Sequence, residues 1–239
     1  MMNITTSTID YRDGGTQLEG FLASPAKANT PLSAVMIAHM WGGRVEFVCD
    51  KARQLAELGY AAFALDMYGK GVLGRNPEEN AKLMQPFMDN RPMLQQRITA
   101  AFKTVRALPQ IDPGRIAVIG YCFGGLCALD LARTSAELCG AVSIHGLLEP
   151  PPERGQIRCK TLLLHGSHDP QAELGSLLAL QQELTAMGAD WQSVIYGHTQ
   201  HAFTNPAANN PAAGTVYNDA SNRRSWLALL NFLHEVLKP

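Results

Sequence analysis

The sequence has no apolar run that approaches the roughly 18 to 20 residues needed to cross a membrane, and residues 1–15 hold neither a basic nor an apolar signal region. It also lacks an excess of positive charge, because 20 lysines and arginines stand against 21 aspartates and glutamates. No basic cluster offers the attraction that a nucleic acid requires. We therefore expect a cytoplasmic protein that binds a small molecule and neither nucleic acid nor a membrane.

A disulfide framework is missing as well. The five cysteines are an odd number and include no Cys-x-x-Cys pair, so we expect free thiols in a reducing compartment. The sequence contains no low-complexity tract, and 46% of its 239 residues are hydrophobic while 17% are charged. This composition excludes a disordered chain and predicts one globular domain over residues 1–239.

Short apolar runs alternate with segments of helical spacing along most of the chain. Leu32–Ala38 is nearly all apolar, as in a strand covered on both faces, and Val48, Ala52 and Leu55 then repeat at helical spacing. This alternation predicts a mostly parallel sheet of seven or eight strands with helices on both faces. These elements leave only 67–92 as possible cover and no room for a separate lid domain. The expected strands are an N-terminal hairpin turning at 13–15, then 32–38, 61–65, 115–120, 140–144, 161–164 and 191–196, with a loop over 67–80 and a last helix over 217–237.

Cys122 stands out among the cysteines because it lies between an expected strand and an expected helix, with Gly120 and Gly124 two residues to either side. A nucleophile on a sharp strand-to-helix turn needs small residues at these positions, since larger side chains would collide. The N-terminus of the following helix also favours a thiolate. A buried structural thiol is the alternative, and it is our interpretation of the other four cysteines.

A thiol nucleophile needs a base and a group that orients the base. Asp169 follows the expected strand 161–164 and His201 follows 191–196, which gives the chain order of an α/β-hydrolase triad. His198 competes with His201, and the His-x-x-His pairs at 165–168 and 198–201 leave a metal site as an alternative. Such a pair in a loop is a weak signal, so no metal is expected.

Acyl transfer also needs N–H donors for the oxyanion that forms during the reaction. We expect one donor at Phe123, directly after the nucleophile, and the other at Trp41, in the loop that follows the strand 32–38. A simple glycine turn over 39–43 is the alternative.

The chain resembles the dienelactone hydrolase (carboxymethylenebutenolidase) family of the α/β-hydrolase superfamily. The resemblance rests on LAELGYAAFALDMYG at 55–69, GYCFGG at 120–125, HGSHDP at 165–170 and HAFTNP at 201–206. It implies an α/β-hydrolase fold that works without a cofactor. It also implies a catalytic triad made of Cys122, Asp169 and His201. The His-Ala-Phe signature selects His201 over His198 as the histidine of this triad.

Two positions depart from the family pattern. Met40 stands where prototype members have a glutamate that holds the resting thiol, and Asn205 stands where they have an arginine that binds the substrate carboxylate. Without that glutamate, we expect the resting enzyme to hold more Cys122 thiolate paired with His201 imidazolium than prototype members do. Glu46, six residues further on, is a carboxylate that could substitute for it, but no sequence signal places the Glu46 side chain.

We expect a hydrolase that cleaves a small ester or lactone through an acyl-thioenzyme. The alternatives are a non-hydrolytic binding protein on the same fold and a redox-sensing thiol, for which Cys127 would be the partner of Cys122. Five residues along a helix place Cys127 off the face of Cys122, which disfavours the redox function. The sequence carries no signal for an oligomeric state. Besides Trp41, the expected substrate-contacting residues are Met40, Arg44, Arg75, Tyr121, His145 and Asn205.

Overall fold

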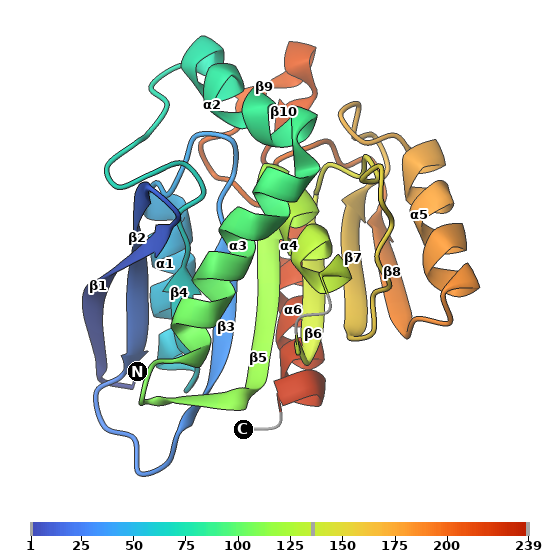
Figure 1. The fold of residues 1–239 in the computed structure, drawn as a ribbon. Coiled ribbons are helices and arrows are strands. Elements are labelled where there is room, and N and C mark those ends of the chain that lie inside the picture. The colour runs from blue at the N-terminus through green and yellow to red at the C-terminus, as the bar shows by residue number, and fades with distance from the viewer. Residues whose placement is uncertain (1, 135–136, 238–239) are drawn as a thin grey trace.

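A computed structural model describes residues 2–134 and 137–237. Eight strands form one sheet in the order β1-β2-β4-β3-β5-β6-β7-β8 (Figure 1). β2 is antiparallel to both neighbours, and all pairs from β4 to β8 are parallel, which confirms the predicted sheet. The strands are β1 (Ile4–Asp13), β2 (Thr16–Pro25), β3 (Leu32–Ala38), β4 (Ala61–Ala64), β5 (Ile111–Tyr121), β6 (Gly140–Ile144), β7 (Lys160–Gly166) and β8 (Trp191–Tyr196).

Helices cover both faces of the sheet. α1 (Glu46–Glu57) and α6 (Asp219–Leu237) share one face, where the Lys51 ammonium of α1 lies 4.7 Å from the ring centre of Trp226 in α6. α3 (Arg91–Arg106) and α4 (Phe123–Arg133) cross the other face, in front of the sheet in Figure 1. A buried ion pair between Arg133 and Glu183 joins α4 to α5 (Leu174–Ala186).

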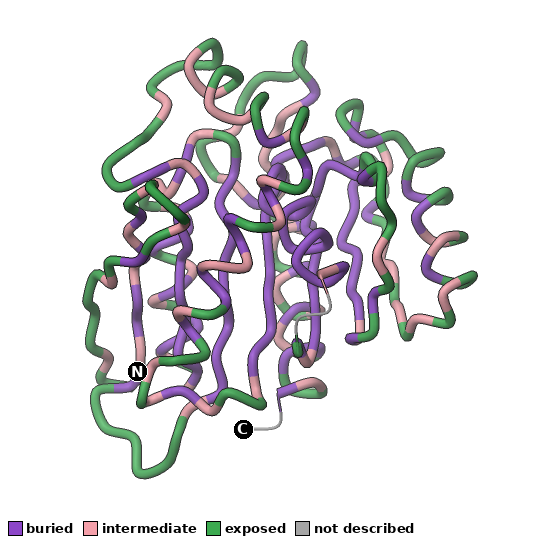
Figure 2. The backbone as a smooth tube through the Cα atoms, viewed as in Figure 1, coloured by how far each residue is buried: buried purple, intermediate pink, exposed green. Residues whose placement is uncertain are grey.

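The core is made by the central strands and the helix that packs across them. Every residue of β4 and β6 is buried, and Figure 2 shows the strands in the middle of the molecule almost entirely in purple. All eleven residues of α4 are buried too, so its N-terminus is fixed at the carboxyl end of β5. In a parallel sheet this end of the strands is where functional side chains gather. No helix within the described ranges is long and apolar enough to cross a membrane.

Two segments near that end differ from the sequence-based expectation. The loop expected over 67–80 gives way at Pro77 to α2 (Pro77–Asp89), whose first turn is capped by the Asn76 side chain, which accepts a 2.9 Å hydrogen bond from the Glu79 N–H. A small ribbon of β9 (Asn209–Asn210) and β10 (Thr215–Val216) was not expected at all. Both segments lie above the sheet in Figure 1. The carboxyl end of the strands is therefore covered by two segments rather than by 67–92 alone.

Candidate active site

Cys122 occupies the turn between β5 and α4 with φ 55° and ψ −121°, a backbone conformation that residues with side chains rarely adopt. The glycines on either side permit this turn. A Cβ at Gly120 would lie 1.8 Å from the carbonyl oxygen of Gly124, and a Cβ at Gly124 would lie 2.2 Å from that of Ala38. The Cys122 N–H donates a 3.1 Å hydrogen bond to the Ile144 carbonyl, which ties the turn to β6. The structure therefore gives the steric reason for the Gly-x-Cys-x-Gly pattern.

His201 and Asp169 form a buried pair beside this turn. The His201 Nδ1 donates a 2.7 Å hydrogen bond to the Asp169 Oδ2, and both side chains are almost fully buried. The other carboxylate oxygen, Oδ1, accepts hydrogen bonds from the N–H groups of Gln171 (2.9 Å) and Ala172 (3.2 Å). These bonds fix the carboxylate and, through it, the orientation of the His201 ring. The second ring nitrogen, Nε2, has no hydrogen-bond partner of good geometry among the described residues, which leaves it available beside Cys122.

The charges around His201 favour its protonated form. Burial of the ring lowers the pKa of His201, but the Cys122 thiol and the Asp169 carboxylate outweigh burial and raise it to about 10. Cys122 stands at the N-terminus of α4, beside the His201 ring. The thiolate and imidazolium pair expected from the sequence stays a prediction.

The backbone of His201 is held by the unexpected ribbon. Its N–H donates to the Gly214 carbonyl (2.9 Å), and its carbonyl accepts from the Val216 N–H (3.1 Å). His198, the competing histidine, is exposed and stacks on His168 with ring centres 5.4 Å apart. Geometry thus joins His201, and not His198, to Asp169.

The histidines do not gather into a metal site. Within residues 2–134 and 137–237, no group of three or more His, Cys, Asp or Glu side chains is placed to hold a metal ion. His165 is buried at the end of β7, whereas His168 and His198 lie on the surface.

The peptide group between Met40 and Trp41 is locked from its carbonyl side. The Met40 oxygen accepts a 3.1 Å hydrogen bond from the Gly43 N–H and a 2.6 Å hydrogen bond from the His39 Nδ1. The His39 Nε2 accepts from the Met67 N–H at 3.1 Å, so the ring is neutral with its proton on Nδ1, and burial lowers the pKa of His39. In the described part of the chain, no protein group accepts a hydrogen bond from the backbone N–H of Trp41.

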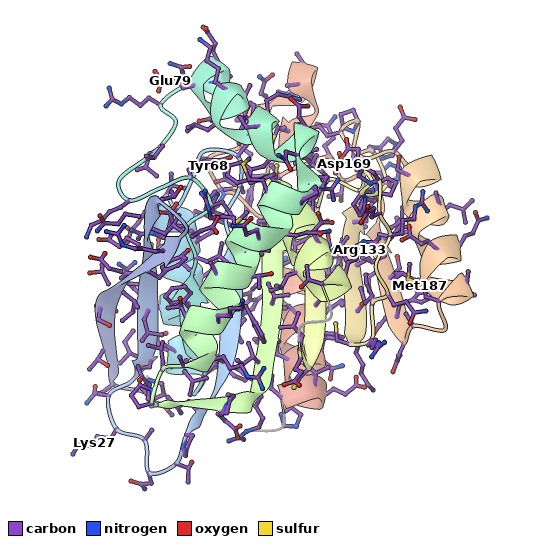
Figure 3. The ribbon with its side chains drawn as sticks, in the orientation of Figure 1. Lys27, Tyr68, Glu79, Arg133, Asp169 and Met187 are labelled. Atoms are coloured by element: carbon purple, nitrogen blue, oxygen red, sulfur yellow. The ribbon has the colours of Figure 1, made fainter. Side chains whose placement is uncertain are left out.

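Phe123 offers the second candidate donor. It is the first residue of α4, so its N–H has no acceptor within the helix. Tyr68 contacts both halves of this donor pair, because its ring stacks on that of Phe123 at 6.0 Å and its hydroxyl donates a 2.9 Å hydrogen bond to the Trp41 carbonyl. Tyr68 and Asp169 are both labelled near the upper end of the sheet in Figure 3. Sequence reasoning missed His39 and Tyr68 as positioning residues, although His39 directly follows the expected strand 32–38 and Tyr68 comes three residues after the expected strand 61–65.

A cavity of about 310 Å³ opens beside Cys122 and His201. Its size suits a small molecule. Two of the six predicted contact residues, Met40 and Asn205, line it together with Trp41. The apolar side chains of the lining are Met40, Trp41, Val45, Ala202 and Ala208, and the neutral polar ones are Asn80, Gln171, Asn205 and Thr215.

The prediction was wrong for the other four contact residues, because none of them lines this cavity. Arg44 donates a 2.6 Å ion-pair hydrogen bond to Glu19 instead, and Arg75 is exposed in the loop before α2. Tyr121 is buried with its ring edge-on to Phe47, at 5.1 Å between ring centres.

His145 is the fourth of these residues, and it lies behind His201 rather than in the cavity. Its buried ring packs edge-on against the His201 ring at 5.1 Å, and its Nε2 is 2.8 Å from the Thr204 hydroxyl. Burial and the charge of His201 lower the pKa of His145 well below its ordinary value. His145 therefore supports His201 as a neutral neighbour.

The geometry does not support two alternatives raised from the sequence, a replacement carboxylate at Glu46 and a redox partner at Cys127. Glu46 is exposed on α1, where it pairs with Arg53, so it does not replace the carboxylate missing at Met40. Cys127 is fully buried in α4, and burial raises the pKa of its thiol well above the ordinary value. A thiol in that state is poorly suited to attack an oxidised Cys122.

Comparison with protein-family models matches residues 18–237 to the family described as "Dienelactone hydrolase family". The chain belongs to this family. The match covers the sheet from β2 onwards and includes the Cys122 turn, Asp169 and His201, so the family resemblance drawn from four short motifs is confirmed over nearly the whole chain.

Similar proteins agree with this assignment. A crystal structure of a dienelactone hydrolase-like promiscuous phosphotriesterase from metagenomic libraries is 32% identical, covers 98% of both chains and has a TM-score of 0.93. A putative carboxymethylenebutenolidase of Aquifex aeolicus is 26% identical over 96% of this chain and 98% of its own. A probable 2-oxo-3-(5-oxofuran-2-ylidene)propanoate lactonase of Bradyrhizobium is 26% identical over 94% and 97%. The fold is that of the α/β-hydrolases, without a separate lid in the described residues, and the family is one of hydrolases.

Proposed function

We propose that this protein hydrolyses small esters or lactones through a Cys122, His201 and Asp169 triad and an acyl-thioenzyme. The observation that carries the proposal is the buried 2.7 Å hydrogen bond between His201 and Asp169, beside a cysteine held at positive φ on a strand-to-helix turn. A structural cysteine has no need of this strained turn or of a charged histidine at its side. The match over 18–237 also supports a single domain.

The first half of the reaction forms the acyl-thioenzyme. The Cys122 thiolate attacks the carbonyl carbon, and the electron pair of the C=O bond moves to the oxygen, which accepts hydrogen bonds from the N–H groups of Phe123 and Trp41. When this intermediate collapses, the C–O bond to the leaving group breaks. The His201 imidazolium then gives its Nε2 proton to the departing alkoxide.

The second half releases the acid. Neutral His201 takes a proton from water, and the resulting hydroxide equivalent attacks the thioester carbon. Collapse of the second tetrahedral intermediate breaks the C–S bond and restores the thiolate beside the imidazolium. Asp169 keeps the Nδ1 proton in place and stabilises the cation in both resting and intermediate states.

Relatives described as a carboxymethylenebutenolidase and a lactonase support esters and lactones as the substrate class, and one relative is a promiscuous phosphotriesterase. Five free cysteines and a thiol nucleophile suit a reducing environment, so we propose a cytoplasmic location and a small-molecule partner. A non-hydrolytic binding protein is the alternative function, and the experiment below distinguishes it.

The test is a panel of 4-nitrophenyl esters, small lactones and one aryl dialkyl phosphate, assayed with wild type, Cys122→Ala and the control Cys139→Ala. Cys139 is half-buried at the far end of the sheet, before β6, so its variant is expected to keep wild-type rates. We expect Cys122→Ala to lose activity and wild type to gain the mass of one acyl group on Cys122 during turnover. Activity that survives in Cys122→Ala would refute the nucleophile, and binding without turnover in wild type would favour the alternative.

A further inference from the structure

The cavity beside Cys122 lacks, among the described residues, the charged side chains that would bind a charged substrate. None of the described residues that line it is a lysine, arginine, aspartate or glutamate, and its only cationic group is the His201 ring. That ring is already hydrogen-bonded to Asp169 and adjoins the Cys122 sulfur. With Cys122 as thiolate, the three groups together carry a net negative charge, which repels another anion.

The two arginines closest in sequence to the pocket loops do not change this balance. Arg44 is about four-fifths buried and binds Glu19 at 2.6 Å, so turning it toward the cavity would leave the Glu19 carboxylate without this partner. Arg75 is exposed and does not line the cavity.

The polar side chains of the pocket suit neutral oxygen atoms rather than a carboxylate. The Asn205 Oδ1 accepts a hydrogen bond from the Ala207 N–H, which leaves its amide N–H groups as donors without a full charge. The Asn80 amide nitrogen donates to the carbonyls of Asn76 and Gly74 (3.3 Å each), so only its amide oxygen, an acceptor, is left for another partner. An acceptor oxygen opposes a carboxylate and tolerates an apolar or ether group.

Apolar surface continues from the cavity to its rim. Trp41 lines the cavity and is 37% exposed, and Val72 and Leu73 are 38% and 47% exposed. The loop that carries them packs along the Trp41 loop, because the Gly74 N–H donates to the Gly42 carbonyl at 3.1 Å. These side chains offer a surface for an apolar chain or ring that extends out of the cavity.

We propose that this pocket selects uncharged substrates, namely esters and lactones with an apolar acyl group and no carboxylate, because the cavity supplies apolar walls and neutral donors but no free cation. The inference rests on the proposed hydrolase function. Transfer of a carboxylate into such a cavity removes its hydration without providing a counter-charge.

The test compares three substrates with one leaving group: 4-nitrophenyl hexanoate, mono-4-nitrophenyl adipate and methyl 4-nitrophenyl adipate. The adipate half-ester adds a negative charge at the end of the acyl chain, and its methyl ester restores neutrality while keeping the polarity. For wild type, we expect kcat/KM for both neutral substrates to exceed that for the half-ester on the order of 10- to 100-fold.

Two variants place the cause of the selectivity in the pocket. Asn205→Arg supplies a cation at the cavity wall and should raise kcat/KM for the half-ester to nearly that of the neutral substrates. The neutral control Asn205→Gln should keep the wild-type difference in kcat/KM between the neutral substrates and the half-ester. Arg75→Ala should leave all three rates unchanged. Equal or faster turnover of the half-ester by wild type would overturn the selectivity alone. Absence of turnover of all three substrates would overturn the hydrolase function and, with it, this inference.

Discussion

The Tyr68 hydroxyl donates a 2.9 Å hydrogen bond to the Trp41 carbonyl oxygen, while the Tyr68 ring stacks on Phe123. One side chain therefore touches both residues whose N–H groups are the proposed oxyanion donors. Trp41 lies in the loop after β3 and Phe123 begins α4, and one side chain from a third segment contacts both. Tyr68, after β4, supplies that contact.

Removal of this hydroxyl should affect the transition state more than substrate binding. In Tyr68→Phe we expect kcat to fall about three- to tenfold with KM nearly unchanged, which is the effect of one ordinary hydrogen bond. Tyr60→Phe, at a buried tyrosine before β4, is the matched control and should keep wild-type kinetics. Steady-state assays with a 4-nitrophenyl ester measure both parameters. A rise in KM with unchanged kcat would show that Tyr68 acts on binding instead.

The glycine at position 120 should be irreplaceable for folding. A Cβ there would stand 1.8 Å from the Gly124 carbonyl, and the obstacle is backbone at the buried start of α4 rather than a movable side chain. We expect Gly120→Ala to lose roughly 3 kcal/mol or more of unfolding free energy, or about 10 °C in Tm. Gly175→Ala, in α5 with open space around its Cβ position, is the control and should be neutral or slightly stabilising. Thermal unfolding followed by circular dichroism compares the two, and equal Tm values would contradict the steric argument.

Most of the sheet could be predicted from the sequence because its signals are local. The buried strands are short apolar runs, and β8 has the expected bounds of 191–196. The nucleophile turn was equally local, because the requirement for glycine acts within four residues. His201 and Asp169 were found through short motifs and chain order, and the structure joins them at 2.7 Å. Their catalytic role stays a prediction.

The parts that sequence reasoning missed depend on contacts between distant segments. Arg44 was expected at the substrate, but a carboxylate 25 residues away on β2 binds it, and no local pattern indicates that pairing. The ribbon of β9 and β10 has only two residues in each strand, too few for any periodicity. Tyr68 makes one hydrogen bond to loop backbone and His39 makes two, and composition and spacing do not encode such contacts.

The reactivity of Cys122 should depend on the charge of His201. Because the pKa of His201 is raised to about 10, the ring stays protonated through neutral pH and stabilises the thiolate there. We expect the rate of alkylation by iodoacetamide to change less than about threefold between pH 6.5 and 7.5, where an ordinary thiol of pKa about 8.5 changes nearly tenfold.

Two variants control this measurement. Cys122→Ala reports the background from the half-buried Cys139, and His201→Asn removes the cation and should restore the steep profile of an ordinary thiol. A steep profile in wild type as well would show that no thiolate and imidazolium pair exists at rest.

Asp169→Asn should move the single proton of neutral His201 from Nδ1 to Nε2. The Oδ1 of Asp169 accepts two backbone N–H groups, from Gln171 and Ala172, so the asparagine oxygen must keep that place and its NH₂ must face the His201 Nδ1. The ring nitrogen then accepts instead of donating, and the proton moves to Nε2, where neutral His201 can no longer take a proton from water. We expect kcat to fall roughly 100-fold or more, with Asp190→Asn, an exposed site before β8, as the unaffected control. Nitrogen NMR of the imidazole should show protons on both Nδ1 and Nε2 in wild type, whose ring is an imidazolium at neutral pH, and a proton on Nε2 alone in the variant. A variant that keeps its Nδ1 proton while losing activity would assign Asp169 an electrostatic role only.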